Sequence, residues 1–112
     1  MNIKSIVLTT ALLLSSTWAF AESEHLPQAV EHTKMAITHG KAGHAPILVE
    51  HATTALTHAE ASEKAEANTH TTEGITHLKA AIEVGNKGDA KGGTTHAEEA
   101  LKHLEMATVP KK

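Results

Sequence analysis

The chain has 112 residues, with ten His, ten Lys, thirteen acidic residues and a formal net charge of -3 at pH 7 when His is neutral. It has no Cys, which excludes a disulfide scaffold and a thiolate metal site, and it is too short for a large multidomain enzyme. Trp18 and Phe20 are the only aromatic residues other than His, so any core that forms after them must be built from Ala and a few Leu, Ile and Val.

Residues 1–21 have the layout of a cleavable export signal. Lys4 lies in a short basic start, residues 6–20 are mainly apolar, and residues 19–21 (Ala-Phe-Ala) fit a cleavage site that precedes a polar segment. The alternative is a membrane anchor, but about fifteen apolar residues are fewer than the ~20 needed to cross a bilayer. We therefore predict a signal peptide at residues 1–21 and a mature His-rich domain at residues 22–112, located in the periplasm.

The ten His fall into four groups, and within each group the step is always seven residues. Seven residues of α-helix rise about 10.5 Å and return to nearly the same face, so each group forms a row along one helix. The groups, in chain order, are His25, His32 and His39; His44, His51 and His58; His70 and His77; His96 and His103.

Glycine-containing and polar segments separate these groups and indicate where the helices end. Tight turns are expected at residues 40–43 and 85–88, because Gly adopts the left-handed conformation that terminates helices. The polar residues 62–69 are expected to link the two halves of the chain. Thr95 and Glu98 match a capping box, which predicts that the last helix begins late or is kinked.

A shift of 45 residues superimposes the two halves of the chain without a gap, so that His25 falls on His70. An internal duplication of a helix-turn-helix unit is the economical explanation. The pattern fails at Val84 and Asp89, which stand where the first half has His39 and His44.

Apolar and small residues lie beside the His rows in heptad register. With every His at position c, a packing seam follows at d and a, as in Leu26, Val30, Thr33 and Ile37. Position g carries small residues, with Leu48 the exception; the small ones are Ala29, Ala36, Ala55, Gly74, Ala81, Gly93 and Ala100. This pattern predicts an all-α fold, an antiparallel four-helix bundle made of two duplicated helical hairpins, with a thin core of marginal stability in the absence of metal.

Folding each hairpin about its turn brings two His rows together. Two His seven residues apart cannot easily bind one ion, because a metal–nitrogen bond is only about 2.0–2.1 Å long. Antiparallel helices that meet through small g residues, however, place His from both helices at the same height. The predicted pairs are His39/His44, His32/His51, His25/His58, His77/His96 and His70/His103. A sixth pair, Val84/Asp89, is predicted to be weak or empty.

Four further candidate ligands lie one helical turn from these His. Glu73 and Glu99 are candidates either as ligands or as surface charges, and Glu99 can instead pair with Lys102 or with a His. Met35 and Met106 are interpreted first as packing residues and second as thioether ligands. Imidazoles with a carboxylate or water suit Cu(II), Ni(II) and Zn(II), and with no thiolate available Cu(II) is favoured by intrinsic affinity.

The mature chain resembles the small metal-binding protein (SmbP) family of ammonia-oxidising bacteria. The resemblance covers nearly all of residues 22–107, and its most specific segments are residues 39–44 (HGKAGH), 74–78 (GITHL) and 96–100 (HAEEA). It implies a His-rich periplasmic four-helix bundle that binds several divalent metals, notably copper, with a role in metal storage, buffering or tolerance. Where the family has His in both hairpin turns, the second turn of this chain has Val84 and Asp89.

We therefore expect a non-enzymatic, monomeric protein that binds several Cu, Ni or Zn ions per chain for metal homeostasis. A periplasmic protein that receives the metal is a further candidate partner. Nucleic acid is excluded, because the mature chain is mildly acidic and has no basic patch, and no membrane contact is expected after signal cleavage. The alternative is a helical interaction or chaperone module that responds to pH through His protonation. Metal-dependent catalysis would need a shaped pocket that excludes water, whereas the His are expected on the flat flank of a helix pair.

Overall fold

The computed structural model describes residues 24–109, and this range contains four α-helices. They are α2 (His25–Lys41), α3 (Ala45–Ala65), α4 (Thr69–Asn86) and α5 (Ala90–Thr108). The predicted signal peptide lies outside the described residues. Within them, no helix is both long and apolar enough to span a bilayer.

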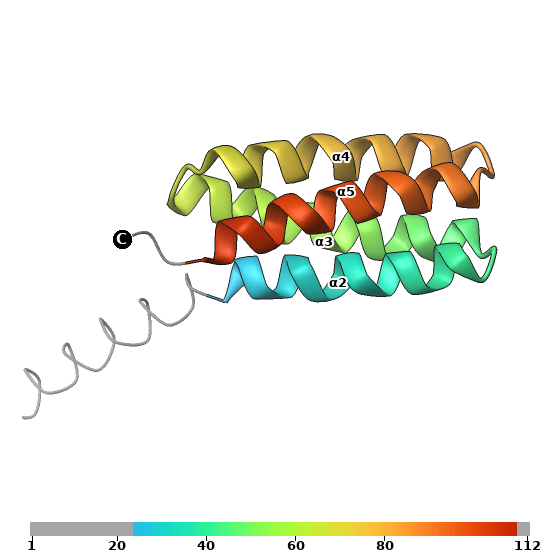
Figure 1. The fold of residues 1–112 in the computed structure, drawn as a ribbon, viewed down its shortest axis with the longest axis horizontal. Coiled ribbons are helices and arrows are strands. Elements are labelled where there is room, and N and C mark those ends of the chain that lie inside the picture. The colour runs from blue at the N-terminus through green and yellow to red at the C-terminus, as the bar shows by residue number, and fades with distance from the viewer. Residues whose placement is uncertain (1–23, 110–112) are drawn as a thin grey trace, which may run out of the picture.

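The four helices form an antiparallel bundle of two hairpins (Figure 1). α2 packs against α3 and α4 against α5, and the hairpins join through contacts of α2 with α5 and of α3 with α4. α3 also contacts α5 across the interior. The predicted four-helix bundle of two helical hairpins is confirmed, whereas the duplication of one hairpin from the other stays a prediction.

Both hairpin turns end on a glycine in the left-handed conformation. Gly43 has φ of 84° and Gly88 has φ of 86°, a region that L side chains rarely adopt. Gly40 and Gly85, which we also assigned to the turns, instead lie buried in the last turns of α2 and α4. Their role is close packing, because a Cβ on Gly85 would lie 2.6 Å from the Val49 Cγ2 of α3.

The predicted late start of the last helix is wrong. α5 begins at Ala90, directly after Asp89, whose side-chain Oδ1 accepts a hydrogen bond of 2.8 Å from the Gly92 N–H. An Asp at this position satisfies one of the free N–H groups of the first turn. Thr95 lies within the helix, where its hydroxyl donates to the Lys91 carbonyl.

The link between the hairpins is shorter than the predicted link at residues 62–69. α3 continues to Ala65, so only residues 66–68 connect it to α4. Asn68 then caps α4, and its Oδ1 accepts a 2.8 Å hydrogen bond from the His70 N–H. Glu63 of α3 ties the two helices together, because its carboxylate accepts hydrogen bonds from the Asn68 N–H and from the Thr72 hydroxyl.

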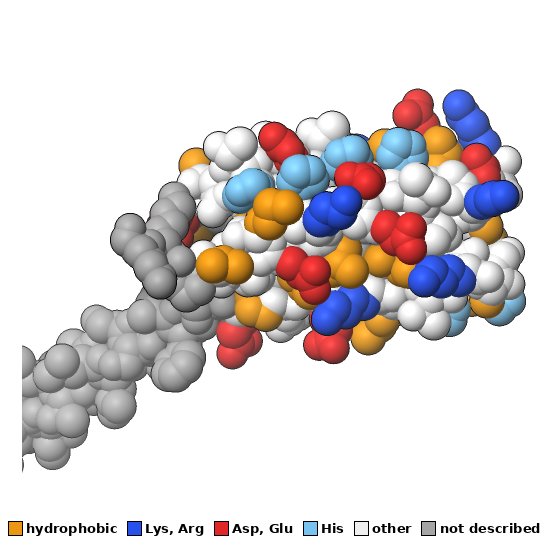
Figure 2. Space-filling view, in the orientation of Figure 1, with side chains coloured by type: hydrophobic (Ala, Val, Ile, Leu, Met, Phe, Trp, Pro, Cys, Tyr) orange, Lys and Arg blue, Asp and Glu red, His pale blue; other side chains and the backbone are white. Residues whose placement is uncertain are grey.

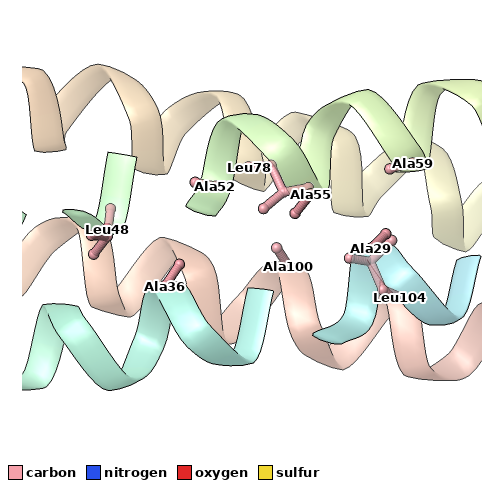
Figure 3. Close-up of a cluster of buried hydrophobic side chains, with 9 residues drawn as sticks. All are labelled: Ala29, Ala36, Leu48, Ala52, Ala55, Ala59, Leu78, Ala100 and Leu104. Atoms are coloured by element: carbon pink, nitrogen blue, oxygen red, sulfur yellow. The ribbon is translucent and has the colours of Figure 1, made fainter. Parts of the chain in front are cut away.

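The core is made mostly of Ala around three fully buried leucines, Leu48, Leu78 and Leu104 (Figure 3). Heptad positions g and d are nearly all buried, whereas the larger residues at position a mostly pack against the edge of the core. These half-buried residues include Val30, Val49, Leu56, Ile75, Ile82 and Leu101. The predicted d and a seam is therefore displaced toward g, because small residues let the helices come closest there.

The glycines at position g show how near the two helices of one hairpin come. A Cβ on Gly74 of α4 would lie 2.8 Å from Leu104 Cγ and 3.5 Å from the Ala100 carbonyl oxygen of α5. A Cβ on Gly93 of α5 would lie 3.5 Å from the Ala81 carbonyl oxygen of α4. Since His occupies position c, next to g on the helix surface, this approach also brings together the His of the two helices.

Candidate metal centre

The first hairpin carries a continuous row of imidazoles, which we call the first His ladder; its members are His25, His32, His39, His44, His51 and His58. Each pair predicted for this hairpin is formed, and the ring centroids are 5.3 Å apart for His25/His58, 5.6 Å for His32/His51 and 6.0 Å for His39/His44. Stacked rings connect successive pairs, because His32 lies 6.0 Å from His58 and His39 lies 5.5 Å from His51. The imidazoles of α2 and α3 therefore alternate along the hairpin.

Two pairs of the first His ladder already have the spacing of two ligands on one ion. The Nδ1 atoms are 3.1 Å apart in His25/His58 and 3.4 Å apart in His32/His51. Two nitrogens bound at about 2.0–2.1 Å are roughly 2.9 Å apart at a right angle and roughly 3.3 Å apart at a tetrahedral angle. The backbone therefore holds these imidazoles where a metal ion fits between them after small side-chain adjustments.

The second hairpin carries a shorter row, the second His ladder, which consists of His70, His77, His96 and His103. The ring centroids are 5.9 Å apart for His70/His103 and 6.1 Å apart for His77/His96, and His77 stacks on His103 at 5.7 Å. Figure 2 shows His side chains in a line along α4 and α5. All five His pairs expected from the spacing are thus brought together.

Three ring nitrogens of the second His ladder are buried without a hydrogen-bond partner among the described residues: the Nδ1 atoms of His70, His96 and His103. A buried polar atom without a partner costs free energy, because it has lost its hydrogen bond to water. A metal ion would satisfy such a nitrogen, so the atoms that remain free fit a metal-binding role.

The sixth position of the pattern has the backbone of a His pair but no imidazole. The Asp89 N–H donates to the Val84 carbonyl over 3.1 Å, as the His44 N–H does to the His39 carbonyl over 2.9 Å. The Asp89 carboxylate is engaged in capping α5. The turn geometry is therefore common to both hairpins, whereas the second hairpin has two imidazoles fewer.

Nine of the ten His are half-buried, and His44 is exposed. Half-burial leaves each row within reach of ions from solvent while it removes part of the water around each ring. Desolvation lowers the pKa of His58 below its ordinary value of 6.5, and the nearby charges of His25 and His32 lower it further. A lowered pKa keeps this imidazole neutral, which is the form that binds metal.

Two carboxylates join the second His ladder. Glu73 Oε1 lies 3.1 Å from His103 Nε2 on the facing helix. Glu99 groups with His77 and His103, with one potential ligand atom of each within 4.8 Å of the others. Glu99 Oε2 also lies 3.6 Å from Lys102 Nζ, so the predicted ion pair exists beside the cluster. The sequence pattern places Glu73 next to the His of its own helix. The pairing of His70 with His103 is the signal that predicts its contact across the hairpin.

The two methionines do not pack in the core. Met35 is 39% exposed and Met106 is 43% exposed, so our first interpretation of them as packing residues is wrong. Both lie at heptad position f, which is on the far side of the His row from the buried g position. Their role as thioether ligands stays a prediction.

Comparison with protein families gives a match that covers nearly the whole chain. The family described as small metal-binding protein matches residues 1–107. A comparison with curated proteins finds no match. The resemblance inferred from the seven-residue His pattern is therefore confirmed.

Proposed function

The chain belongs to the small metal-binding protein family, and from this premise we propose that its two His ladders bind several divalent transition-metal ions per molecule. Cu(II) is bound most tightly, and Ni(II) and Zn(II) more weakly, because imidazole sites follow the general order of divalent metal affinity. The protein buffers or stores these ions and does not transform a substrate. Its family is defined by metal binding and is not a known enzyme family.

The observation that carries this proposal is the pairing of imidazole nitrogens across each hairpin. The 3.1 Å between the Nδ1 atoms of His25 and His58 is a ligand spacing that two His seven residues apart on one helix cannot supply. The half-exposed His rows support exchange of the bound ions, since no ion would need a buried path to enter or leave. Sites without thiolate ligands hold such ions less tightly than Cys sites do, which suits buffering.

We also propose the periplasm as the site of action. This part of the proposal depends on residues 1–21, whose basic start, apolar stretch and small residues at positions 19 and 21 match an export signal. The intact mass of the protein recovered from a periplasmic extract would match a chain that starts at Glu22. A mass that includes residues 1–21 would contradict cleavage.

Calorimetric titration at pH 7 tests the binding function. The purified protein should bind several Cu(II) ions, and the double variant His32→Ala/His51→Ala should bind fewer, because it loses the central pair of the first His ladder. The matched control is Thr38→Ala/Thr57→Ala, which changes one exposed residue on each of the same helices and should keep the stoichiometry. An unchanged stoichiometry in the His variant would count against binding by the ladder.

A further inference from the structure

The two His ladders differ in the chemistry of their ligands. Two carboxylates, those of Glu73 and Glu99, lie beside the imidazoles of the second His ladder. The residues 45 positions earlier, in the first hairpin, are Gln28 and Thr54, which supply no carboxylate. The first ladder therefore offers neutral imidazole nitrogens, whereas the second offers nitrogens together with anionic oxygens.

The carboxylate of Glu99 completes a group of three ligands with His77 and His103. Within residues 24–109 this is the one group of three or more His and acidic side chains whose ligand atoms all lie within 4.8 Å of one another. Ligands on opposite sides of one ion are at most about 4.2 Å apart, given metal–ligand bonds of about 2.0–2.1 Å. Small side-chain rotations would therefore close the group around an ion.

Two observations support the binding of a cation by this group. The His103 Nδ1 is buried and has no hydrogen-bond partner among the described residues, while its Nε2 faces Glu73 at 3.1 Å. The neighbouring ammonium group is that of Lys102, whose pair with Glu99 spans 3.6 Å between side chains that are 63% and 45% exposed. An exposed ion pair of this kind is weak, so Lys102 does not block the carboxylate.

We propose that the second His ladder holds a distinct nitrogen–oxygen site, made by His77, Glu99 and His103 with Glu73 beside it, which takes the first Zn(II) ion that the protein binds. Two imidazoles and a carboxylate are a ligand set that binds Zn(II) and leaves a position for water. The carboxylates offset the charge of the cation, which the neutral rings of the first His ladder cannot do. The first ladder binds metal through imidazoles alone, so the protein has two classes of site. This inference rests on the proposed metal-binding function.

The test is a titration of the purified full-length protein with Zn(II) alone, followed through the NMR signals of the His side chains. The signals of His77 and His103 should shift with the first equivalent of Zn(II), before those of the first His ladder. Glu99→Gln should lower the affinity for this first ion about tenfold or more, since even outer groups around a metal site change affinity by about 10–100-fold. The matched control is Glu105→Gln, which neutralises an exposed carboxylate of the same helix and should leave the affinity unchanged.

A second variant tests whether adding a carboxylate is sufficient to create a Zn(II) site in the first His ladder. Thr54 stands between His51 and His58 as Glu99 stands between His96 and His103, so Thr54→Glu should raise the Zn(II) affinity of the first His ladder. Helical circular dichroism of each variant confirms that it is folded. The proposal is overturned if Zn(II) shifts the first ladder first, or if Glu99→Gln binds Zn(II) as tightly as Glu105→Gln. If either result is found but the wild-type protein binds Cu(II), the proposed metal-binding function still holds. If the wild-type protein binds neither Cu(II) nor Zn(II), the proposed function and the proposed Zn(II) site are both wrong.

Discussion

His58 of the first His ladder lies among other imidazoles, and they affect its protonation even before metal binds. At His58, desolvation is the largest effect and the charges of His25 and His32 add to it, so that the pKa is lowered. The same neighbours are the groups with which His58 would share an ion. The lowered pKa thus belongs to a member of the pair whose Nδ1 atoms are 3.1 Å apart.

The lowered pKa of His58 gives a predicted pH dependence for the metal-free protein. The unfolded chain, in which His titrates near 6.5, binds more protons than the folded chain between the two pKa values. The contribution of His58 to stability is therefore complete above about pH 6.5 and is lost as the pH falls through the folded pKa. NMR titration should place the His58 pKa below 6.5. His25→Ala should move it upward without restoring it fully, because desolvation remains; a wild-type value at or above 6.5 would refute the prediction.

At the scale of the helices, glycine determines how closely the hairpins pack. Gly85 lies in α4 at position d, and its missing Cβ leaves room for Val49 Cγ2 of α3 at 2.6 Å and Leu48 Cδ2 at 3.3 Å. From the sequence we expect Gly40 and Gly85 to lie in the turns, because a Gly at the end of a helical pattern usually terminates the helix. Only the partner helix distinguishes a terminating glycine from one that permits close packing.

Gly85→Ala should therefore destabilise the bundle even though Ala is the better helix former. Overpacking costs about 1–3 kcal/mol, against a gain of about 1 kcal/mol in helix propensity, so the free energy of unfolding should fall by about 1 kcal/mol. In a Val49→Ala background the nearest obstruction, Val49 Cγ2, is gone and only Leu48 Cδ2 at 3.3 Å remains, so the same substitution should become stabilising. Urea unfolding of the four proteins in this double-mutant cycle measures the reversal, and a Gly85→Ala effect of the same sign in both backgrounds would exclude the packing explanation.

For the molecule as a whole, the seven-residue spacing of the His was enough to predict the fold and the five His pairs. This spacing determines on which face of its helix a residue lies and at which position along the helix axis. It did not predict that position g would be more buried than position a, or that Glu73 would reach His103. Those features depend on side-chain volume and reach between helices. The sequence pattern also did not predict the start of α5 at Ala90. Asp89 caps this helix at the position where the first hairpin has His44.

Each His ladder joins the two helices of one hairpin, and none of the five His pairs links one hairpin to the other. Metal binding should therefore stabilise each hairpin separately and leave the contacts of α2 with α5 and of α3 with α4 unchanged. The core that holds the hairpins together contains three fully buried leucines among alanines and a few threonines. We therefore expect the metal-free bundle to have a low free energy of unfolding.

Saturation with Cu(II) at pH 7 should raise the Tm of the protein, and a chelator should reverse the rise. Ligand that binds only the folded state at 100 times its Kd adds about 2.7 kcal/mol per site, a large share of the stability of a small domain. His32→Ala/His51→Ala should retain part of the increase, because the second His ladder spans the other hairpin. The increase should disappear near pH 5, where protons compete for the imidazole nitrogens. Thermal unfolding with and without Cu(II) at both pH values checks this, and an equal Tm with and without Cu(II) at pH 7 would show that the ladders do not bind metal in the folded state.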